Sequence, residues 1–159
     1  MQSPKRTRFR KVQKGRLYGI RVPKKRLSFG QFGLRAIETG RITASAIESA
    51  RRTISRALNR TGQVFITVYP QIPITHKPNE VRMGRGKGSL DHWCAAVLSG
   101  VVIFEITGVS KDLAYKALKL ASAKLPIKTS IIGFKPIVHD YRHVNISTCS
   151  YYEPEPVKI

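Results

Sequence analysis

Apolar and polar residues alternate in a way that predicts several short strands. Residues 63–69 begin with glutamine and then alternate aliphatic side chains at even positions with aromatic or threonine side chains at odd positions, which is typical of a strand. Further strands or extended segments are expected at residues 28–37, 93–98, 101–107 and 127–132. Ser99 and Gly100 separate two of these strands by two residues, a spacing that predicts a β-hairpin. Pro70 and Pro73 are expected to end the strand at 63–69 and to open a long loop that lasts to residue 92.

Two other segments have apolar residues at helical spacing. The first helix is expected at residues 43–60, with an apolar stripe made of Ile47, Ala50, Ile54, Ala57 and Leu58. Ser45 and Glu48 form an S-x-x-E capping pattern, and Thr43 is a competing cap two residues earlier. Both starts are compatible with the sequence.

The second helix is expected from a Ser110 cap to about Lys124, because Pro126 prevents its continuation. Its predicted buried face consists of Leu113, Ala117, Leu120 and Ala121. The resulting order, β-α-β-β-β-α-β, predicts an α+β two-layer sandwich with both helices on one face of a mixed or antiparallel sheet. We expect one globular domain at residues 28–130, a basic extended N-terminal arm at 1–27 and a C-terminal extension at 131–159.

Charge is distributed very unevenly over this framework. The net charge is +20, residues 1–90 carry +18 of it, and the first acid is Glu38. The first 37 residues contain cations and no acid, so this segment repels itself and needs a polyanion to order it. Nucleic acid is the simplest such partner. A membrane is not expected, because the arm lacks an apolar stripe and the longest nearly apolar run, residues 93–104, is too short to span a bilayer.

Arginines on the first predicted helix point to the same partner. Arg52, Arg56 and Arg60 recur every four residues beside Arg51. No acid is close enough to pair with Arg56 or Arg60, since Glu48 is best matched to Arg52. A solvated helix face is the alternative, but the lack of partner acids favours phosphate contacts.

A glycine-rich loop carries the most distinctive local pattern. Glycine alternates with cations in Gly84-Arg85-Gly86-Lys87-Gly88, which lets the backbone approach a phosphate surface closely. A nucleotide-binding P-loop fails on spacing, because its first glycine would fall at Val81 and its hydroxyl at Gly88. A plain flexible loop is the remaining alternative.

Catalytic and metal-binding patterns are absent from the sequence. Nine acids leave few candidate general acids or bases, and His76 and His92 have no nearby cysteine or carboxylate pair. His139 and His143 have i, i+4 spacing but no close third ligand, so we expect surface histidines. We therefore expect neither an enzyme nor a cofactor or metal.

Several motifs, in order, resemble the bacterial-type large-subunit ribosomal protein sixteen family. They are residues 4–11 (PKRTRFRK), 29–34 (FGQFGL), 40–43 (GRIT), 47–52 (IESARR), 77–78 (KP), 81–88 (VRMGRGKG), Trp93, 104–106 (FEI), 108–109 (GV) and 123–129 (AKLPIKT). The resemblance covers about residues 3–130. Charge alone indicates nucleic acid; only this resemblance indicates a ribosome.

The resemblance implies a structural role on large-subunit rRNA near the central protuberance, where members help to shape the aminoacyl-tRNA site and join late in assembly. The arm would thread between RNA helices toward the tRNA, the loop would pack near the tRNA, and Arg82 matches an arginine that can be hydroxylated in bacteria. The expected rRNA-binding residues are Lys5, Arg6, Arg8, Arg10, Lys11, Lys14, Arg16, Arg51, Arg52, Arg56 and Lys77. The expected loop residues near rRNA and tRNA are Arg82, Met83, Gly84, Arg85, Gly86, Lys87 and Gly88. A free basic RNA-binding or RNA-chaperone protein is the alternative, and a chromatin-like DNA binder fits less well.

The C-terminal extension departs from the family pattern. It is neutral, aromatic and proline-tipped, which suits contact with neighbouring ribosomal proteins better than RNA. Such an extension suggests an organellar ribosome. Because the family motif begins at residue 3, we expect no targeting leader before it, and hence a protein encoded by the organelle genome. We expect a mitochondrial protein, with plastid or bacterial cytoplasm as alternatives.

Overall fold

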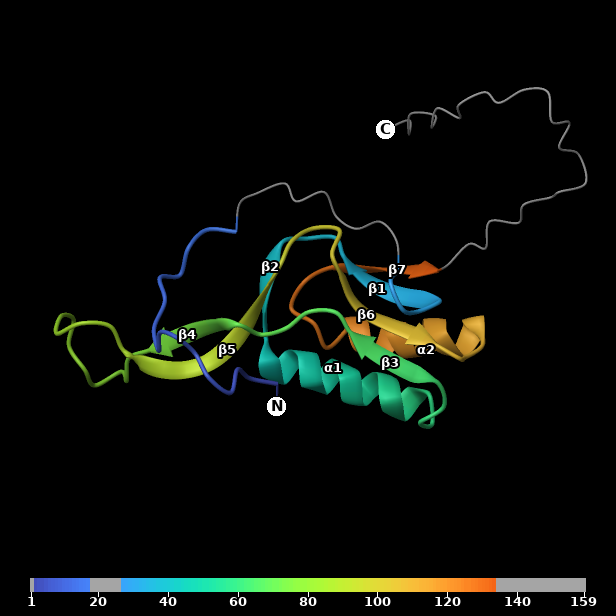
Figure 1. Cartoon of the computed structure of the whole chain (residues 1–159), viewed down its shortest axis with the longest axis horizontal. Coiled ribbons are helices and arrows are strands. Elements are labelled where there is room, and N and C mark those ends of the chain that lie inside the picture. Colours follow the sequence, from blue (N-terminus) through green and yellow to red (C-terminus); the bar gives the residue numbers. More distant parts are fainter. Residues whose placement is uncertain (1, 18–26, 134–159) are drawn as a thin grey trace, which may run out of the picture.

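The computed structural model describes residues 2–17 and 27–133, and its strands form two antiparallel sheets (Figure 1). The four-stranded sheet has the order β3-β6-β1-β7 and the three-stranded sheet the order β2-β5-β4. The elements are β1 (Phe32–Ala36), β2 (Gly40–Thr43), α1 (Ala44–Ala57), β3 (Gln63–Ile66), β4 (Ile72–His76), β5 (Ser89–Val97), β6 (Val102–Thr107), α2 (Lys111–Ser122) and β7 (Thr129–Gly133). The predicted α+β class is confirmed, and the pairing is antiparallel throughout these strands.

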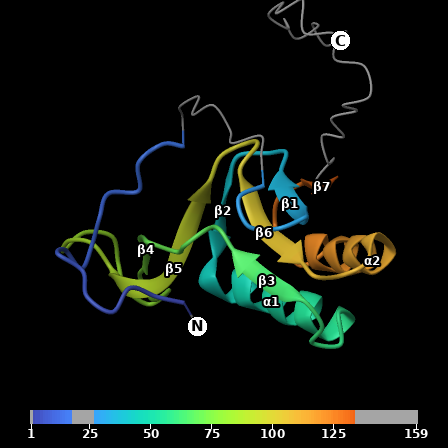
Figure 2. The ribbon, with the colours of Figure 1, turned by 45° about the vertical axis from the view of Figure 1, so that its right-hand side comes forward.

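Both helices pack against each other and against the same side of the four-stranded sheet, as Figures 1 and 2 show. The apolar stripe of α1 supplies Ile47 and Ile54, which are fully or almost fully buried, and α2 supplies Leu118. Phe104 of β6 and Leu34 of β1 face them and are completely buried. This core fixes the four-stranded sheet, in which β1 follows the N-terminal arm, whereas the loop between β4 and β5 belongs to the three-stranded sheet.

The predicted hairpin between residues 93–98 and 101–107 is wrong. β5 pairs with β2 and β4, whereas β6 pairs with β1 and β3, so each strand already has two partners and none of the pairing is between β5 and β6. The chain instead arches at Gly100, whose amide donates to the Ala36 carbonyl at 2.7 Å. Ser99 also donates its hydroxyl to the Ile37 carbonyl at 2.6 Å, so the β5–β6 arch lies on the β1–β2 arch where the two sheets meet.

The predicted loop at residues 70–92 contains two strand segments. β4 includes Pro73, which pairs in register with Trp93, and β5 begins already at Ser89. Proline is tolerated there because β4 lies at the edge of its sheet, where one side of the strand needs no hydrogen-bond donor. The segment is therefore a long hairpin whose connecting loop spans residues 77–88.

Helix ends differ modestly from the predicted ones. Thr43 is the N-cap of α1, since its hydroxyl accepts a hydrogen bond from the Ala46 amide at 3.2 Å. The helix ends three residues before the predicted Arg60, because Asn59 and Arg60 adopt left-handed conformations with φ of 49° and 63°. α2 begins after the Ser110 cap as predicted and ends two residues before Lys124.

Candidate nucleic-acid interface

The N-terminal arm and the loop at residues 77–88 are joined by two reciprocal lysine contacts. Lys11 Nζ donates to the Lys87 carbonyl at 2.7 Å, and Lys87 Nζ donates to the Val12 carbonyl at 2.6 Å. Segments about 75 residues apart in sequence therefore lie side by side, as Figures 1 and 2 show for the arm and the β4–β5 hairpin. We call the exposed surface formed by residues 5–16 and 77–88 the arm–loop surface.

Arg41 holds the second part of the arm. This side chain belongs to β2, and its Nη2 atom donates to the carbonyls of Lys14 and Gly15 at 2.6 and 3.0 Å. Because Arg41 lies just before α1, the arm passes close to the N-terminal end of that helix. Sequence reasoning did not single out Arg41 as part of the site.

All the arm cations predicted to bind rRNA within the described residues are exposed. These are Lys5, Arg6, Arg8, Arg10, Lys11, Lys14 and Arg16. The guanidinium of Arg8 also lies 5.5 Å from the centre of the Phe9 ring, and that ring is itself exposed. Cations and an exposed aromatic ring together are suited to phosphates and unstacked bases.

The loop presents its cations on a backbone that requires glycine. Gly84, Arg85 and Gly86 have φ values of 101°, 53° and 87°, three successive residues in the left-handed region. Gly88 is required for space, because a Cβ atom there would lie 2.5 Å from the His76 carbonyl oxygen. Met83 at the tip is 97% exposed. The glycines thus shape the loop and leave its side chains free to meet a partner.

Within the loop, Lys77 is turned toward the backbone. Its Nζ atom donates to the Gly84 carbonyl at 2.5 Å, so part of its hydrogen-bonding capacity braces the loop. Arg82 and Arg85 are exposed, and the ion pairs found in the described residues do not include them. They are the loop side chains most available for phosphate.

The arginines of α1 divide into two groups. Glu48 accepts hydrogen bonds from Arg51 at 2.7 and 2.8 Å and from Arg52 at 3.0 Å. The hydrogen bond from Arg51, followed by that from Arg52, lowers the pKa of Glu48 to about 2 despite an opposing contribution from burial. Glu48 was expected to pair best with Arg52, yet Arg51 is the better paired of the two, so its predicted rRNA contact would compete with Glu48.

Arg56 is the α1 arginine that the structure leaves most available. It lines two adjoining surface hollows, one shared with Asn59 and Arg60, the other with Arg52 and Lys124. Hydroxyl groups of Ser45, Ser49 and Thr53 line the second hollow. Lys124 was not among the predicted site residues. The only sequence feature that could have indicated it is that no acid lies near it in the chain.

Glu105 organises the point where the arm joins the fold. This carboxylate is only 1% exposed and accepts backbone hydrogen bonds from Ser28 at 3.1 Å, Phe29 at 2.6 Å and Gly30 at 2.7 Å. The Phe29 ring stacks on Phe65 with a centroid distance of 5.5 Å. Sequence reasoning missed this role, although an acid inside the apolar strand Val102–Thr107 is the signal that could have found it.

Neither a metal-binding group of three or more ligands nor a helix able to cross a bilayer occurs in residues 2–17 and 27–133. His92 lies 2.7 Å from the neighbouring Asp91 carboxylate, an exposed pair of adjacent residues. His139 and His143, like Arg21, Lys24, Lys25 and Arg26 of the arm, lie outside the described residues.

The family model and the similar proteins found by comparison all point to one family of ribosomal proteins. The model of a family described as ribosomal protein L16p/L10e matches residues 4–132. The large ribosomal subunit protein uL16 of Acidiphilium cryptum is 54% identical over 132 residues, which are 83% of this chain and 96% of that protein. The proteins of the same name from Bartonella henselae and Blochmanniella pennsylvanica are 53% and 54% identical over 132 and 130 residues, again covering 96% of each relative.

Proposed function

Because the chain belongs to the ribosomal protein L16p/L10e family, we propose that it is a structural constituent of the large ribosomal subunit that binds rRNA through its arm–loop surface. It is a non-enzymatic protein of the translation machinery, with rRNA and other ribosomal proteins as partners. The confirmed family also accounts for the motif order seen in the sequence.

The observation that carries the rRNA assignment is the joining of arm and loop by Lys11 and Lys87. Two basic segments that would each repel themselves lie together, with their arginines exposed. Such a surface is unfavourable until phosphates surround it, because like charges at close range repel. RNA backbones on either side of the arm would supply the missing negative charge.

We place this surface near the central protuberance, with the loop at residues 77–88 helping to shape the aminoacyl-tRNA site. The extreme exposure of Met83 and the available guanidinium groups of Arg82 and Arg85 support contact of this loop with RNA, and the location within the subunit follows from the resemblance to the family. The predicted contacts of Lys5, Arg6, Arg8, Arg10, Lys11, Lys14, Arg16, Arg51, Arg52, Arg56 and Lys77 with rRNA belong to the same proposal. Hydroxylation of Arg82 would add a hydroxyl at an exposed position of the loop.

The C-terminal extension supports two narrower proposals. Of the predicted extension at residues 131–159, residues 133–159 follow the stretch that matches the family, and residues 134–159 lie outside the described residues. We propose that this extension contacts neighbouring ribosomal proteins, since it is neutral and aromatic. We also propose a mitochondrial location, with plastid or bacterial cytoplasm as the alternatives that cell fractionation distinguishes.

Charge reversal of Arg82, Arg85 and Lys87 to glutamate tests the function. We expect reduced incorporation into large subunits, or weaker tRNA binding by subunits that form, because three cations of the arm–loop surface become anions. Gradient sedimentation of cell lysate and tRNA filter binding measure the two effects, and circular dichroism checks that the fold is intact.

The matched control reverses Lys111, Lys116 and Lys119, which changes net charge equally on α2. Its binding of tRNA should stay near the unmodified level, because the α2 lysines lie outside the arm–loop surface. Normal incorporation and normal tRNA binding by the loop variant would contradict the proposal. Release of the unmodified protein from subunits in moderate salt would favour the alternative, a free RNA chaperone, because purely electrostatic contacts are strongly salt-dependent.

A further inference from the structure

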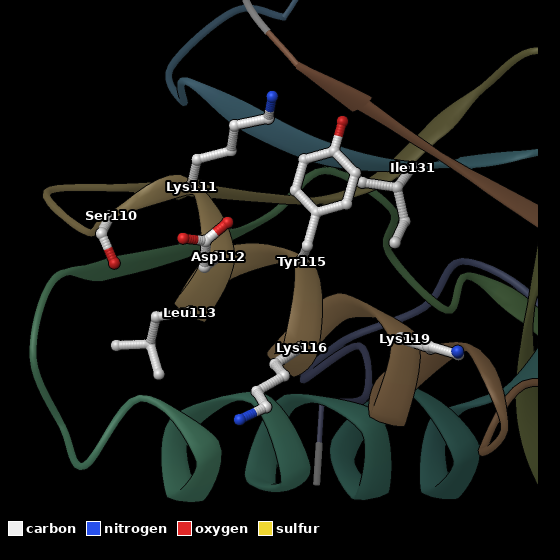
Figure 3. A pocket seen from close by; sticks show the side chains of 8 residues that line it. All are labelled: Ser110, Lys111, Asp112, Leu113, Tyr115, Lys116, Lys119 and Ile131. Atoms are coloured by element: carbon white, nitrogen blue, oxygen red, sulfur yellow. The ribbon is translucent and has the colours of Figure 1, made fainter.

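A second surface, remote in sequence from the arm, is lined by side chains of α2 and β7. A shallow hollow of about 740 Å³ is bordered by Lys111, Leu113, Tyr115, Lys116, Lys119 and Ile131, which we call the α2–β7 face (Figure 3). Its floor is apolar and its border carries three ammonium groups against the single carboxylate of Asp112. Neither the family's motifs nor the arm–loop surface accounts for it.

Tyr115 is the fixed centre of this face. Its ring packs edge-on against Phe32 of β1 at a centroid distance of 6.2 Å, and Lys111 Nζ lies 5.9 Å from the ring centre. The residue nevertheless remains 39% exposed. A held aromatic ring flanked by lysines is suited to a ligand that combines aromatic rings with carboxylates.

The rest of the chain starts directly beside this face. β7 ends at Gly133, where a Cβ atom would lie 3.9 Å from the Tyr115 hydroxyl and 3.5 Å from the Phe32 ring. Residues 134–159 continue from that point and contain Tyr151-Tyr152-Glu153-Pro154-Glu155, an aromatic and acidic sequence in a chain with only nine acids.

Length does not limit the return of this sequence to α2. The connection from Gly133 to Tyr151 can extend to about 60 Å, because an extended residue spans about 3.3 Å. A helix of 12 residues such as α2 is about 18 Å long. The tyrosines can therefore reach any part of the hollow.

We propose that residues 151–155 of this chain dock on the α2–β7 face. The tyrosine rings pack over Tyr115 and Ile131, and the carboxylates of Glu153 and Glu155 lie among the three lysines. RNA suits this face less well, because the face has an apolar floor, an acid and no arginine among its lining residues. If residues 151–155 dock on this face, residues 134–150 are still available for the contact with neighbouring ribosomal proteins that we propose for the extension.

Crosslinking in the RNA-free full-length protein tests the docking, so its result does not depend on ribosome binding. Cys149 lies two residues before Tyr151, and Ser110→Cys adds a thiol at the border of the face, where the native hydroxyl makes no capping bond. A short bismaleimide should join them within one chain about ten-fold faster than in the control, because docking raises their effective concentration. The control is Ser89→Cys, at the end of the β4–β5 hairpin that adjoins its connecting loop.

Further variants identify the groups responsible. Replacing Glu153 and Glu155 by glutamine should slow the Ser110→Cys reaction, whereas Asp140→Asn in the same extension should not. Cys149→Ser should abolish it, because Cys94 is buried and burial raises the pKa of its thiol. Equal rates for Ser110→Cys and Ser89→Cys would overturn the proposal. A rate that rises with protein concentration would also overturn it, by assigning the face to a second copy.

Discussion

Glu105 shows how one buried carboxylate can position a whole arm. Its acceptors satisfy three successive backbone N–H groups, at Ser28, Phe29 and Gly30, where the chain enters the sheet. We predict that Glu105→Gln lowers the free energy of unfolding by ~1–3 kcal/mol, because an amide offers one acceptor oxygen and places an unpaired donor in a buried site. Urea denaturation measures this change.

The matched control for that variant is Glu80→Gln in the exposed loop. It removes the same charge where nothing is buried, so its effect should stay within about 0.5 kcal/mol. Equal stability losses for the two variants would contradict the role assigned to Glu105.

Glu48 makes stability depend on pH in a defined direction. Its pKa falls from the ordinary 4.5 to about 2, chiefly because Arg51 donates to it, so the folded state binds its proton less readily than the unfolded state. The stabilisation is therefore complete above pH 4.5 and is lost as the pH falls toward 2. We expect Glu48→Gln to cost ~0.5–1 kcal/mol at pH 7, a modest value because Arg52 is largely exposed and Arg51 partly exposed to solvent.

Denaturation of both proteins between pH 7 and pH 2.5 checks this assignment. The difference between the unmodified protein and Glu48→Gln should shrink steadily below pH 4.5. A difference that persists unchanged at pH 2.5 would mean that the ion pairs are not its origin.

At the scale of elements, the two helix starts provide a natural comparison. The Thr43 hydroxyl caps α1 by accepting from the Ala46 amide, whereas Ser110 occupies the N-cap of α2 without a side-chain hydrogen bond. Thr43→Ala should therefore destabilise the protein by ~1 kcal/mol, and Ser110→Ala by distinctly less. Thermal denaturation followed by circular dichroism distinguishes them, and a larger loss for Ser110→Ala would reverse the assignment.

Helices were easier to predict than strands for a physical reason. The stripe that includes Ile47 and Ile54 depends only on local spacing, and it predicted α1 to within a few residues. The pairing of β5 and β6 depends on which strands lie beside them, and the arches at Ile37 and Gly100 cannot be read from a two-residue spacer. Pro73 was predicted to lie in a loop, although it belongs to β4. Proline is tolerated there because β4 is an edge strand, and only the sheet order shows this.

At the scale of the molecule, the charge pattern predicted the kind of partner but not the composite surface. The concentration of cations in residues 1–90 was visible in the sequence, whereas the contacts that join Lys11 to Lys87 and Arg41 to the arm connect distant residues. On α1 the sequence predicted that Glu48 pairs best with Arg52, whereas the structure shows that Glu48 also accepts two hydrogen bonds from Arg51.

Salt dependence tests whether the arm contacts phosphate. Replacing Arg6, Arg8 and Arg10 by glutamine should reduce the slope of log K against log salt for rRNA-fragment binding by about 2–3, since each lost phosphate contact contributes about 0.7–0.9. Filter binding at salt concentrations from about 50 to about 200 mM measures this slope. Glutamine at Lys111, Lys116 and Lys119 should leave the slope nearly unchanged, and an equal decrease for both variants would indicate diffuse attraction instead.

The reciprocal contacts of Lys11 and Lys87 also bear on the order of events during subunit assembly. Once either the arm or the loop has been captured by RNA, the other is confined to the same small volume, and its entropic cost of ordering has already been met in part. Capture of one segment should therefore accelerate capture of the other, so that the pair engages as a cooperative unit. The protein would then pass between a loosely tethered and a fully seated state, with few half-seated intermediates.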